Sequence, residues 1–231
     1  MNGFKTLSCV AALLVLVIAI GVLIGWSFDI DWMIRLIPNR TPMNPLTAVC
    51  FILSALALIA RLSSKAPNKL KYLSYLTLLV LLIGVNKLGE YLHFWSFPMD
   101  QWLFHDKLSV KGDWPNQIAP NTALNFVFFS LALLLLDYKT KRQWWPAQWL
   151  LFSTSFLSIL ALLGYLYQVH ELYAVGSFLP MSLPTAVGFL LLLCGAFFAR
   201  PHSGILNLLR QNSSAAINAR WLTIAVFGLP I

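Results

Sequence analysis

Residues 44–51 read Asn44-Pro45-Leu46-Thr47-Ala48-Val49-Cys50-Phe51, and two later stretches follow the same pattern. These are Pro120-Asn121-Thr122-Ala123-Leu124-Asn125-Phe126 and Ser182-Leu183-Pro184-Thr185-Ala186-Val187-Gly188-Phe189. In each, a Thr-Ala pair is followed by Phe four residues after the Thr, and a charged residue comes fourteen or fifteen positions after it. These charged residues are Arg61, Asp137 and Arg200. Self-similarity at this spacing predicts one structural unit that occurs three times.

Each of the three stretches has the residues of a helix start. Asn44, Asn121 or Ser182 can accept a hydrogen bond from the free N–H groups of a first turn, and Pro suits the first helical position. The apolar runs before these stretches end in Gly25-Trp26, Gly89-Glu90-Tyr91 and Gly164-Tyr165. We therefore expect a unit of two helices, out and back, repeated in the same orientation.

The composition places this unit in a lipid bilayer. The chain has 231 residues, of which 59% are hydrophobic and only 10% are charged, and its mean hydropathy is +0.75. An average soluble domain has about 25% charged residues. The net charge of +8 comes from basic residues in short gaps between apolar runs, so it indicates topology and not nucleic-acid binding. Three cysteines inside apolar runs give neither a disulfide framework nor a metal-binding spacing.

Six apolar windows approach the roughly 17 to 25 residues that cross a bilayer. They are Leu7 to Trp26, Pro45 to Ile59, Tyr72 to Leu88, Asn121 to Leu136, Trp149 to Tyr167 and Pro184 to Ala199. A seventh run begins at Trp221 and stops at Ile231, so we expect a fragment of a longer chain. The expected fold is an all-α, polytopic transmembrane helical bundle. Its hairpins cover about 1–65, 66–142 and 143–202, with an interfacial helix at 203–220 and a truncated span at 221–231.

The basic residues predict a cytoplasmic N-terminus, because Lys and Arg collect in loops that are not translocated. With this orientation eleven of the sixteen basic residues lie inside: Lys5, Arg61, Lys65, Lys69, Lys71, Lys139, Lys141, Arg142, Arg200, Arg210 and Arg220. Seven of the eight acidic residues then lie outside. The longest outer connection, Tyr91 to Pro120, alternates aromatic and charged residues and is expected to lie on the membrane surface as an external lid.

Candidate sensing residues fall into three groups. The first group lies at the three helix starts, where the partial positive charges of the helix N-termini could converge on an anionic ligand. Its members are Asn44, Thr47, Asn121, Thr122 and Thr185. Asn86 and Asn125 lie in or near apolar helices, where they either link helices or line a ligand cavity. A metal or proton-sensing site could also form on the outer face, although a solvated interface explains its residues as well: Glu90, His93, His105, His170 and Glu171. Lys87 and Glu90 are spaced to pair with each other.

The whole chain resembles the N-terminal membrane-embedded region of bacterial signalling proteins, ahead of PAS domains and a histidine kinase or diguanylate cyclase. The resemblance rests on Met43 to Ala48, Ala119 to Leu124, Leu163 to Tyr167 with Leu172-Tyr173, Met181 to Phe189 and Ala199-Arg200-Pro201. It implies a sensory input module that passes an external or membrane-borne signal to cytoplasmic output domains. It carries no catalytic residue, cofactor or ligand, and the cofactor stays unknown.

Catalytic motifs are absent from the sequence, so we expect no enzyme in this region. Besides the sensory module, two alternatives stay open: a transporter or channel, and a non-catalytic subunit of a larger membrane complex. The expected localisation is the bacterial inner membrane. The expected partner is the lipid bilayer, with a second copy of the chain and a small-molecule or lipid ligand as further options.

Overall fold

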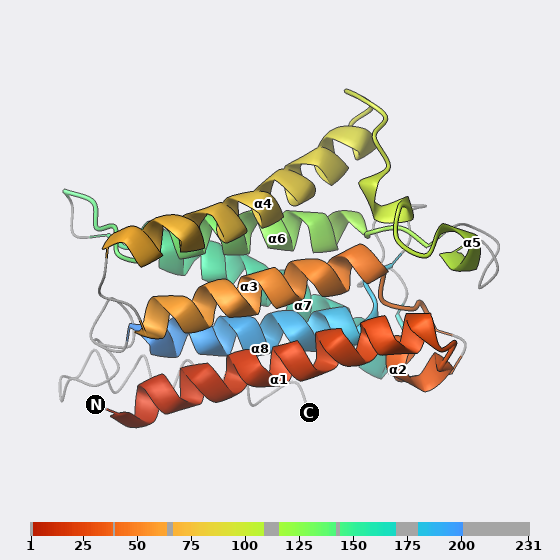
Figure 1. Ribbon diagram of the computed structural model, residues 1–231, viewed down its shortest axis with the longest axis horizontal. Helices are drawn as coiled ribbons and strands as arrows, with labels where there is room; N and C mark the ends of the chain where they lie inside the picture. Colours follow the sequence, from red (N-terminus) through yellow and green to blue (C-terminus); the bar gives the residue numbers. More distant parts are fainter. Residues whose placement is uncertain are drawn as a thin grey trace.

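The computed structural model describes residues 2–38, 40–63, 67–108, 116–141, 144–169 and 180–200, and all regular structure within them is helical (Figure 1). This confirms the all-α prediction. The elements are α1 Asn2–Ser27, α2 Asp31–Arg35, α3 Pro45–Ser63, α4 Pro67–Tyr91, η1 Met99–Gln101, α5 His105–Leu108, α6 Pro120–Leu134, α7 Pro146–Tyr167 and α8 Leu183–Ala199. The predicted linker helix at 203–220 and the seventh span lie outside the described residues.

Within the described residues, three helices are long and apolar enough to cross a membrane: Gly3–Ser27, Pro45–Leu62 and Pro146–Tyr167. The helices α6 and α8 are also apolar but have only 15 and 17 residues. At 1.5 Å per residue their lengths are about 22 and 26 Å, somewhat short of a hydrocarbon core of about 30 Å. Helix α4 is long enough but carries Lys87 and Glu90 in its last turns.

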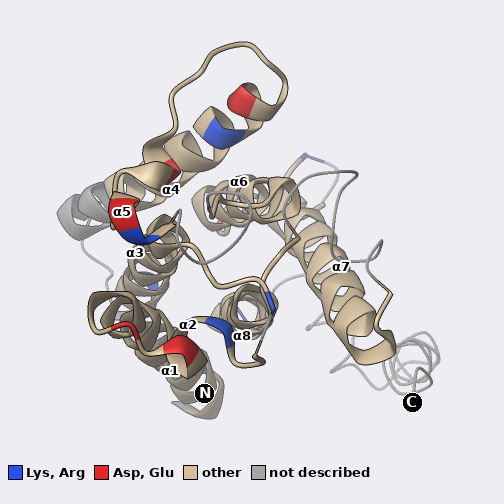
Figure 2. Cartoon of the chain, turned by 90° about the vertical axis from the view of Figure 1, so that its right-hand side faces the viewer, with Lys and Arg blue, Asp and Glu red and all other residues tan. Residues whose placement is uncertain are grey.

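Of the six long helices, three lie at the centre of the bundle and the other three form a ring around them. Helices α3, α6 and α8 lie at the centre, and each outer helix packs against two of them: α1 against α3 and α8, α4 against α3 and α6, and α7 against α6 and α8 (Figure 2). The first and last helices close the ring, where Ser8 Oγ donates to the carbonyl oxygen of Gly195 at 2.6 Å. The beginnings of α3, α6 and α8 all lie at the end that carries η1, which we call the η1 end (Figure 1).

Three phenylalanines fill the centre of the bundle. Phe51, Phe126 and Phe189 are each at most 1% exposed, and their ring centroids lie 5.2, 4.8 and 4.8 Å apart. Tilted and edge-on contacts at these distances are favourable for aromatic rings. Gly188 makes room for this layer, because a Cβ there would lie 2.9 Å from the ring of Phe51.

The starts of the three central helices follow the predicted pattern with one difference. Pro45 and Pro120 are the first residues of α3 and α6, and Pro184 is the second residue of α8. Asn44 Oδ1 accepts from the Leu46 N–H at 2.8 Å, as a helix cap does. The residue that precedes α6 is Ala119, not the expected Asn121, because the helix already begins at Pro120. Ser182 precedes α8 but its hydroxyl bonds the Thr185 hydroxyl at 2.7 Å instead of capping the backbone.

The three outer helices end in the same way. The carbonyl oxygens of Gly25, Gly89 and Gly164 each accept an N–H from the residue five positions later, at 2.9 Å in all three cases. The residue four positions after each glycine has a positive φ: Asp29 (59°), His93 (59°) and Gln168 (57°). This 6→1 hydrogen bond around a left-handed residue is the Schellman ending of a helix, and it satisfies carbonyl groups that would otherwise lack a donor.

Each outer helix is also tied to the start of the next central helix by one aromatic side chain. Trp26 Nε1 donates to the Met43 carbonyl at 2.8 Å. Tyr91 and Tyr165 donate their hydroxyls to the carbonyls of Ile118 and Met181, both at 2.7 Å. In every case the acceptor lies four residues before the threonine of the sequence pattern. The aromatic residues of the pattern therefore fix where each central helix begins.

Candidate functional site

A small polar cavity lies where α3, α6 and α8 begin, at the η1 end of the bundle. Its volume is about 10 Å³. It is lined by Thr41, Pro42, Asn44, Thr47, Gln117, Ile118, Ala119, Thr122, Pro180, Ser182 and Thr185. Four of the candidate residues from the sequence, Asn44, Thr47, Thr122 and Thr185, therefore meet at one place.

The three threonines occupy the same position in their helices. Thr47, Thr122 and Thr185 are each the third residue of α3, α6 and α8, and each is 2% exposed. The N–H groups of a first turn have no acceptor within the helix, so all three helices present donors at this end. Side chains accept from some of these N–H groups. Asn121 Oδ1 accepts from the Thr122 N–H at 3.0 Å, and Asn44 Oδ1 accepts from the Leu46 N–H at 2.8 Å.

Asn44 joins the cavity to the connection between α4 and α6. Its Nδ2 donates to the carbonyl oxygens of Asp100 and Asn116, both at 3.1 Å. Asn116 Nδ2 in turn donates to the Pro42 carbonyl at 2.9 Å. A single side chain thus caps α3 and holds two segments of the connection between α4 and α6 against the start of α3.

A buried ion pair lies next to the cavity. Lys87 Nζ is 2.8 Å from Asp100 Oδ2 and 3.1 Å from Glu90 Oε2, and it donates to the cavity residue Gln117 at Oε1 over 3.2 Å. The Lys87 and Asp100 side chains are 3% and 1% exposed. Asp100 Oδ2 also accepts the Ile118 N–H at 2.8 Å, while its Oδ1 has no partner in the described part of the chain. Taking these charges out of water is costly, so the pair requires this set of contacts.

The sequence predicted the Lys87–Glu90 pair but not the role of Asp100. Asp100 belongs to η1, in a connection expected to lie on the surface among exposed aromatic residues. Phe94 and Trp102 in this connection are 72% and 62% exposed, whereas Asp100 is 1% exposed. An acidic residue between Met99 and aromatic neighbours gives no signal of burial, because its partner Lys87 lies in a different helix.

The other candidate residues lie elsewhere. Asn86 holds the outer connection, with Nδ2 donating to the Phe97 carbonyl at 2.9 Å. Asn125 is fully buried and donates to Ser158 Oγ of α7 at 3.2 Å, as expected for a residue that links helices. His93 is exposed in the turn after α4, and His170 lies outside the described residues. Among residues with a described position, no group of three His, Cys, Asp or Glu side chains could hold a metal ion.

The opposite end of the bundle holds a charged cluster made by the last residues of the three sequence stretches. Asp137 pairs with Arg200, at 2.5 Å from Nε to Oδ1 and 3.1 Å from Nη2 to Oδ2, and with Arg61, at 3.5 Å from Nη1 to Oδ2. The hydrogen bond from Arg200 lowers the pKa of Asp137; partial burial opposes this, and the charges of Arg200 and Arg61 add to it. The Asp137 and Arg200 side chains are 53% and 32% exposed, so their pair is solvated, whereas the Arg61 side chain is only 8% exposed.

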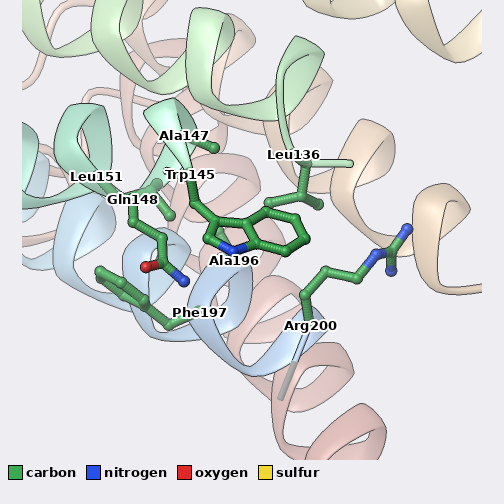
Figure 3. Close-up of a pocket in the computed structure, with 8 residues that line it drawn as sticks. All are labelled: Leu136, Trp145, Ala147, Gln148, Leu151, Ala196, Phe197 and Arg200. Atoms are coloured by element: carbon green, nitrogen blue, oxygen red, sulfur yellow. The ribbon is translucent and has the colours of Figure 1, made fainter. Parts of the chain in front are cut away.

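A second cavity of about 10 Å³ lies beside this cluster, between the start of α7 and the end of α8 (Figure 3). Its lining is mainly apolar, with Trp145 in the middle, and the Arg200 side chain extends away from Gln148 and Phe197 (Figure 3). A wider apolar groove of about 380 Å³ lies between α6 and α7 and is lined by Leu124, Phe128, Phe152, Ser153, Phe156 and Leu157. Neither space gathers the polar groups that the cavity at the η1 end contains.

Comparison with known proteins adds no relative: no protein-family model, curated protein or solved structure matches the chain.

Proposed function

We propose that this chain is the membrane-embedded sensory input domain of a bacterial signal-transduction protein, which couples an external or membrane-borne cue to cytoplasmic output domains. The observation that carries the proposal is that α3, α6 and α8 meet in a polar cavity at one end and in a charged cluster at the other. A ligand that changes how the helix starts pack can bias the packing of the same three helices at the far end.

The proposal includes a threefold repeat of one helix pair: α1 with α3, α4 with α6, and α7 with α8. Equivalent contacts support it at three levels, namely the Schellman endings, the aromatic-to-carbonyl hydrogen bonds and the central phenylalanine layer. Repeats in the same orientation put equivalent residues at the same depth, so a single cavity collects one threonine from each pair.

We further propose six spans in the inner membrane with the N-terminus in the cytoplasm, since most basic residues then lie inside. The test uses single cysteines in a cysteine-free background and a membrane-impermeant maleimide. A cysteine in place of His105 should be labelled in intact cells, and one in place of Lys139 only after permeabilisation. The reverse labelling would contradict the orientation.

A transporter or channel is the weaker candidate because of the phenylalanine layer. The rings of Phe51, Phe126 and Phe189 fill the axis between the central helices, and the described residues along that axis between the two ends are mainly apolar. A solute pathway within a membrane protein is usually marked by polar or ionisable side chains.

The sensory role is tested on the complete gene product by measuring its kinase or cyclase output in membranes. Asn44→Ala removes the cap of α3 and both bonds to the outer connection, so it should change basal output on the order of fivefold, a typical allosteric coupling. The matched control is Asn86→Ala, which loosens the outer connection but leaves the cavity intact. Unchanged output in an inserted, folded Asn44→Ala protein, or a gene product without an output domain, would contradict the proposal.

A further inference from the structure

We propose that the cavity at the η1 end binds one small inorganic anion of the size of chloride. This inference deepens the proposed function by naming a ligand class for the same cavity, but anion binding itself does not require that the chain signals. The case rests on the size of the cavity, on its unused donors and on the direction of the three helices.

The size of the cavity restricts the ligand to a single atom or a similarly small group. A volume of about 10 Å³ is close to the minimum that holds one water molecule, which is about 10 to 15 Å³. Amino acids, sugars and lipid headgroups are much larger, so they could not enter without separating the helices.

The unused groups in the cavity are two threonine hydroxyls, each of which can donate or accept a hydrogen bond. The hydroxyls of Thr47 and Thr122 line it, both residues are 98% buried, and neither hydroxyl bonds another described residue. The corresponding hydroxyl of Thr185 differs because it already bonds Ser182. A buried hydroxyl without a partner costs on the order of 1 to 3 kcal/mol, so two of them at one cavity indicate a ligand that forms hydrogen bonds, and an anion would take both as donors.

The backbone adds a favourable field for a negative charge. Each helix start carries a partial positive charge of about half an elementary charge, and three such starts meet here. The charges beside the cavity oppose anion binding, because Lys87, Glu90 and Asp100 together carry a charge of −1. That charge favours a small cation instead, and the experiment must separate the two cases.

The test measures thermal unfolding of the purified chain in detergent by tryptophan fluorescence, in sodium chloride or sodium bromide against sodium gluconate at equal ionic strength. Gluconate is too large for the cavity. Halide should raise the Tm saturably, on the order of 3 °C at tenfold its dissociation constant. N-methylglucamine chloride should act as sodium chloride does. Equal Tm values in chloride and gluconate, or a dependence on the cation alone, would overturn the anion site.

Variants locate the effect. Thr47→Val with Thr122→Val keeps the side-chain shape, removes both hydroxyls and should abolish the halide shift. Thr154→Val is the matched control, because Thr154 is fully buried in α7 and its hydroxyl bonds the Leu150 carbonyl outside the cavity; it should keep the full shift. A full shift in the double variant would contradict the site.

Two further measurements test the site if the double variant does not fold. Thr47→Ser retains the hydroxyl and should retain the shift, and bromide-soaked crystals of the wild-type chain should show anomalous density within hydrogen-bond distance of Thr47 and Thr122. Density elsewhere only would count against the site. A halide shift without any change in the output of the complete protein would support the anion site and contradict the sensory role, so the two proposals can fail separately.

Discussion

The two ends of the bundle hold charges in opposite ways. At the η1 end, Lys87 and Asp100 are 3% and 1% exposed and are held by the outer connection. At the other end, Asp137 is 53% exposed between two arginines, of which Arg200 is 32% and Arg61 8% exposed. The same three central helices run between them, so the difference comes from the connections. The long connection between α4 and α6 folds back over the helix starts and buries both members of its ion pair, whereas at the other end the carboxylate of Asp137 stays in solvent and only Arg61 is buried.

The largest expected effect comes from breaking the buried pair. Asp100→Asn leaves Lys87 buried with only Glu90 as a charged partner, and we expect a loss of about 3 kcal/mol in the free energy of unfolding, since removing one member of a buried pair usually costs 3 to 5 kcal/mol. Denaturant titration in detergent measures it. The exposed Asp106 is the control, and Asp106→Asn should change little. Equal effects of the two substitutions would remove the contrast between the ends.

A smaller effect is expected from the aromatic contacts at the η1 end. Tyr91→Phe and Tyr165→Phe each remove one hydrogen bond to a carbonyl at the start of a central helix, and each should cost about 1 kcal/mol. Tyr138→Phe, at the opposite end and 56% exposed, should be neutral by the same unfolding measurement. Clearly unequal losses at Tyr91 and Tyr165 would count against equivalent roles in the two helix pairs.

An effect of similar size is expected from the charged cluster at the opposite end. Asp137→Asn weakens the solvated pair with Arg200 and a second pair in which Arg61 is only 8% exposed. Because the carboxylate itself is 53% exposed, the loss should be about 1 kcal/mol, smaller than that of Asp100→Asn. Unfolding at 0.05 and 1 M salt checks this, because screening should reduce the difference from wild type at high salt. A loss as large as that of Asp100→Asn, or one that salt does not change, would show that the cluster behaves as a buried pair.

The smallest expected effect is the pH dependence of the same cluster. Because the pKa of Asp137 is lowered in the folded chain, its contribution is fully present above its ordinary value of 3.8 and is lost as the pH falls through the lowered one. Below about pH 4 the wild type should therefore lose more stability than Asp137→Asn does, by a small amount because the group is solvated. Parallel pH curves for the two proteins would contradict this.

The helices could be predicted from the sequence because their boundaries depend on local chemistry. Proline at the first or second position set the starts of α3, α6 and α8, and the predicted spans overlap all six long helices. The pattern of Thr, Phe and a final charged residue marked equivalent positions in the three stretches, but it could not show that they meet; that Thr47, Thr122 and Thr185 share one cavity is seen only in the structure.

The contacts of the outer connection could not be predicted, because they depend on pairs far apart in the chain. Asp100 meets Lys87, and Asn44 meets Asn116, across 13 and 72 residues. The short helices α2 and α5 were also missed, since 5 and 4 residues give no periodic pattern. Asn86 is a polar residue in an apolar helix and was therefore a candidate for lining a cavity. In the structure it bonds the connection after α4 instead: its side chain donates to the Phe97 carbonyl, and its carbonyl accepts from Trp95 Nε1.

The closed ring has a consequence for how the chain could be divided. In the proposed arrangement of three helix pairs, each pair would present one surface to the pair before it and a different surface to the pair after it, and α1 meets α8 where the first pair contacts the last. Contacts of this head-to-tail kind are satisfied only when the circle is complete. A protein cut between α6 and α7 would expose two matching surfaces on each piece, so the pieces should reassemble when they are made together, whereas either piece alone would keep both surfaces open to lipid or to association with further copies.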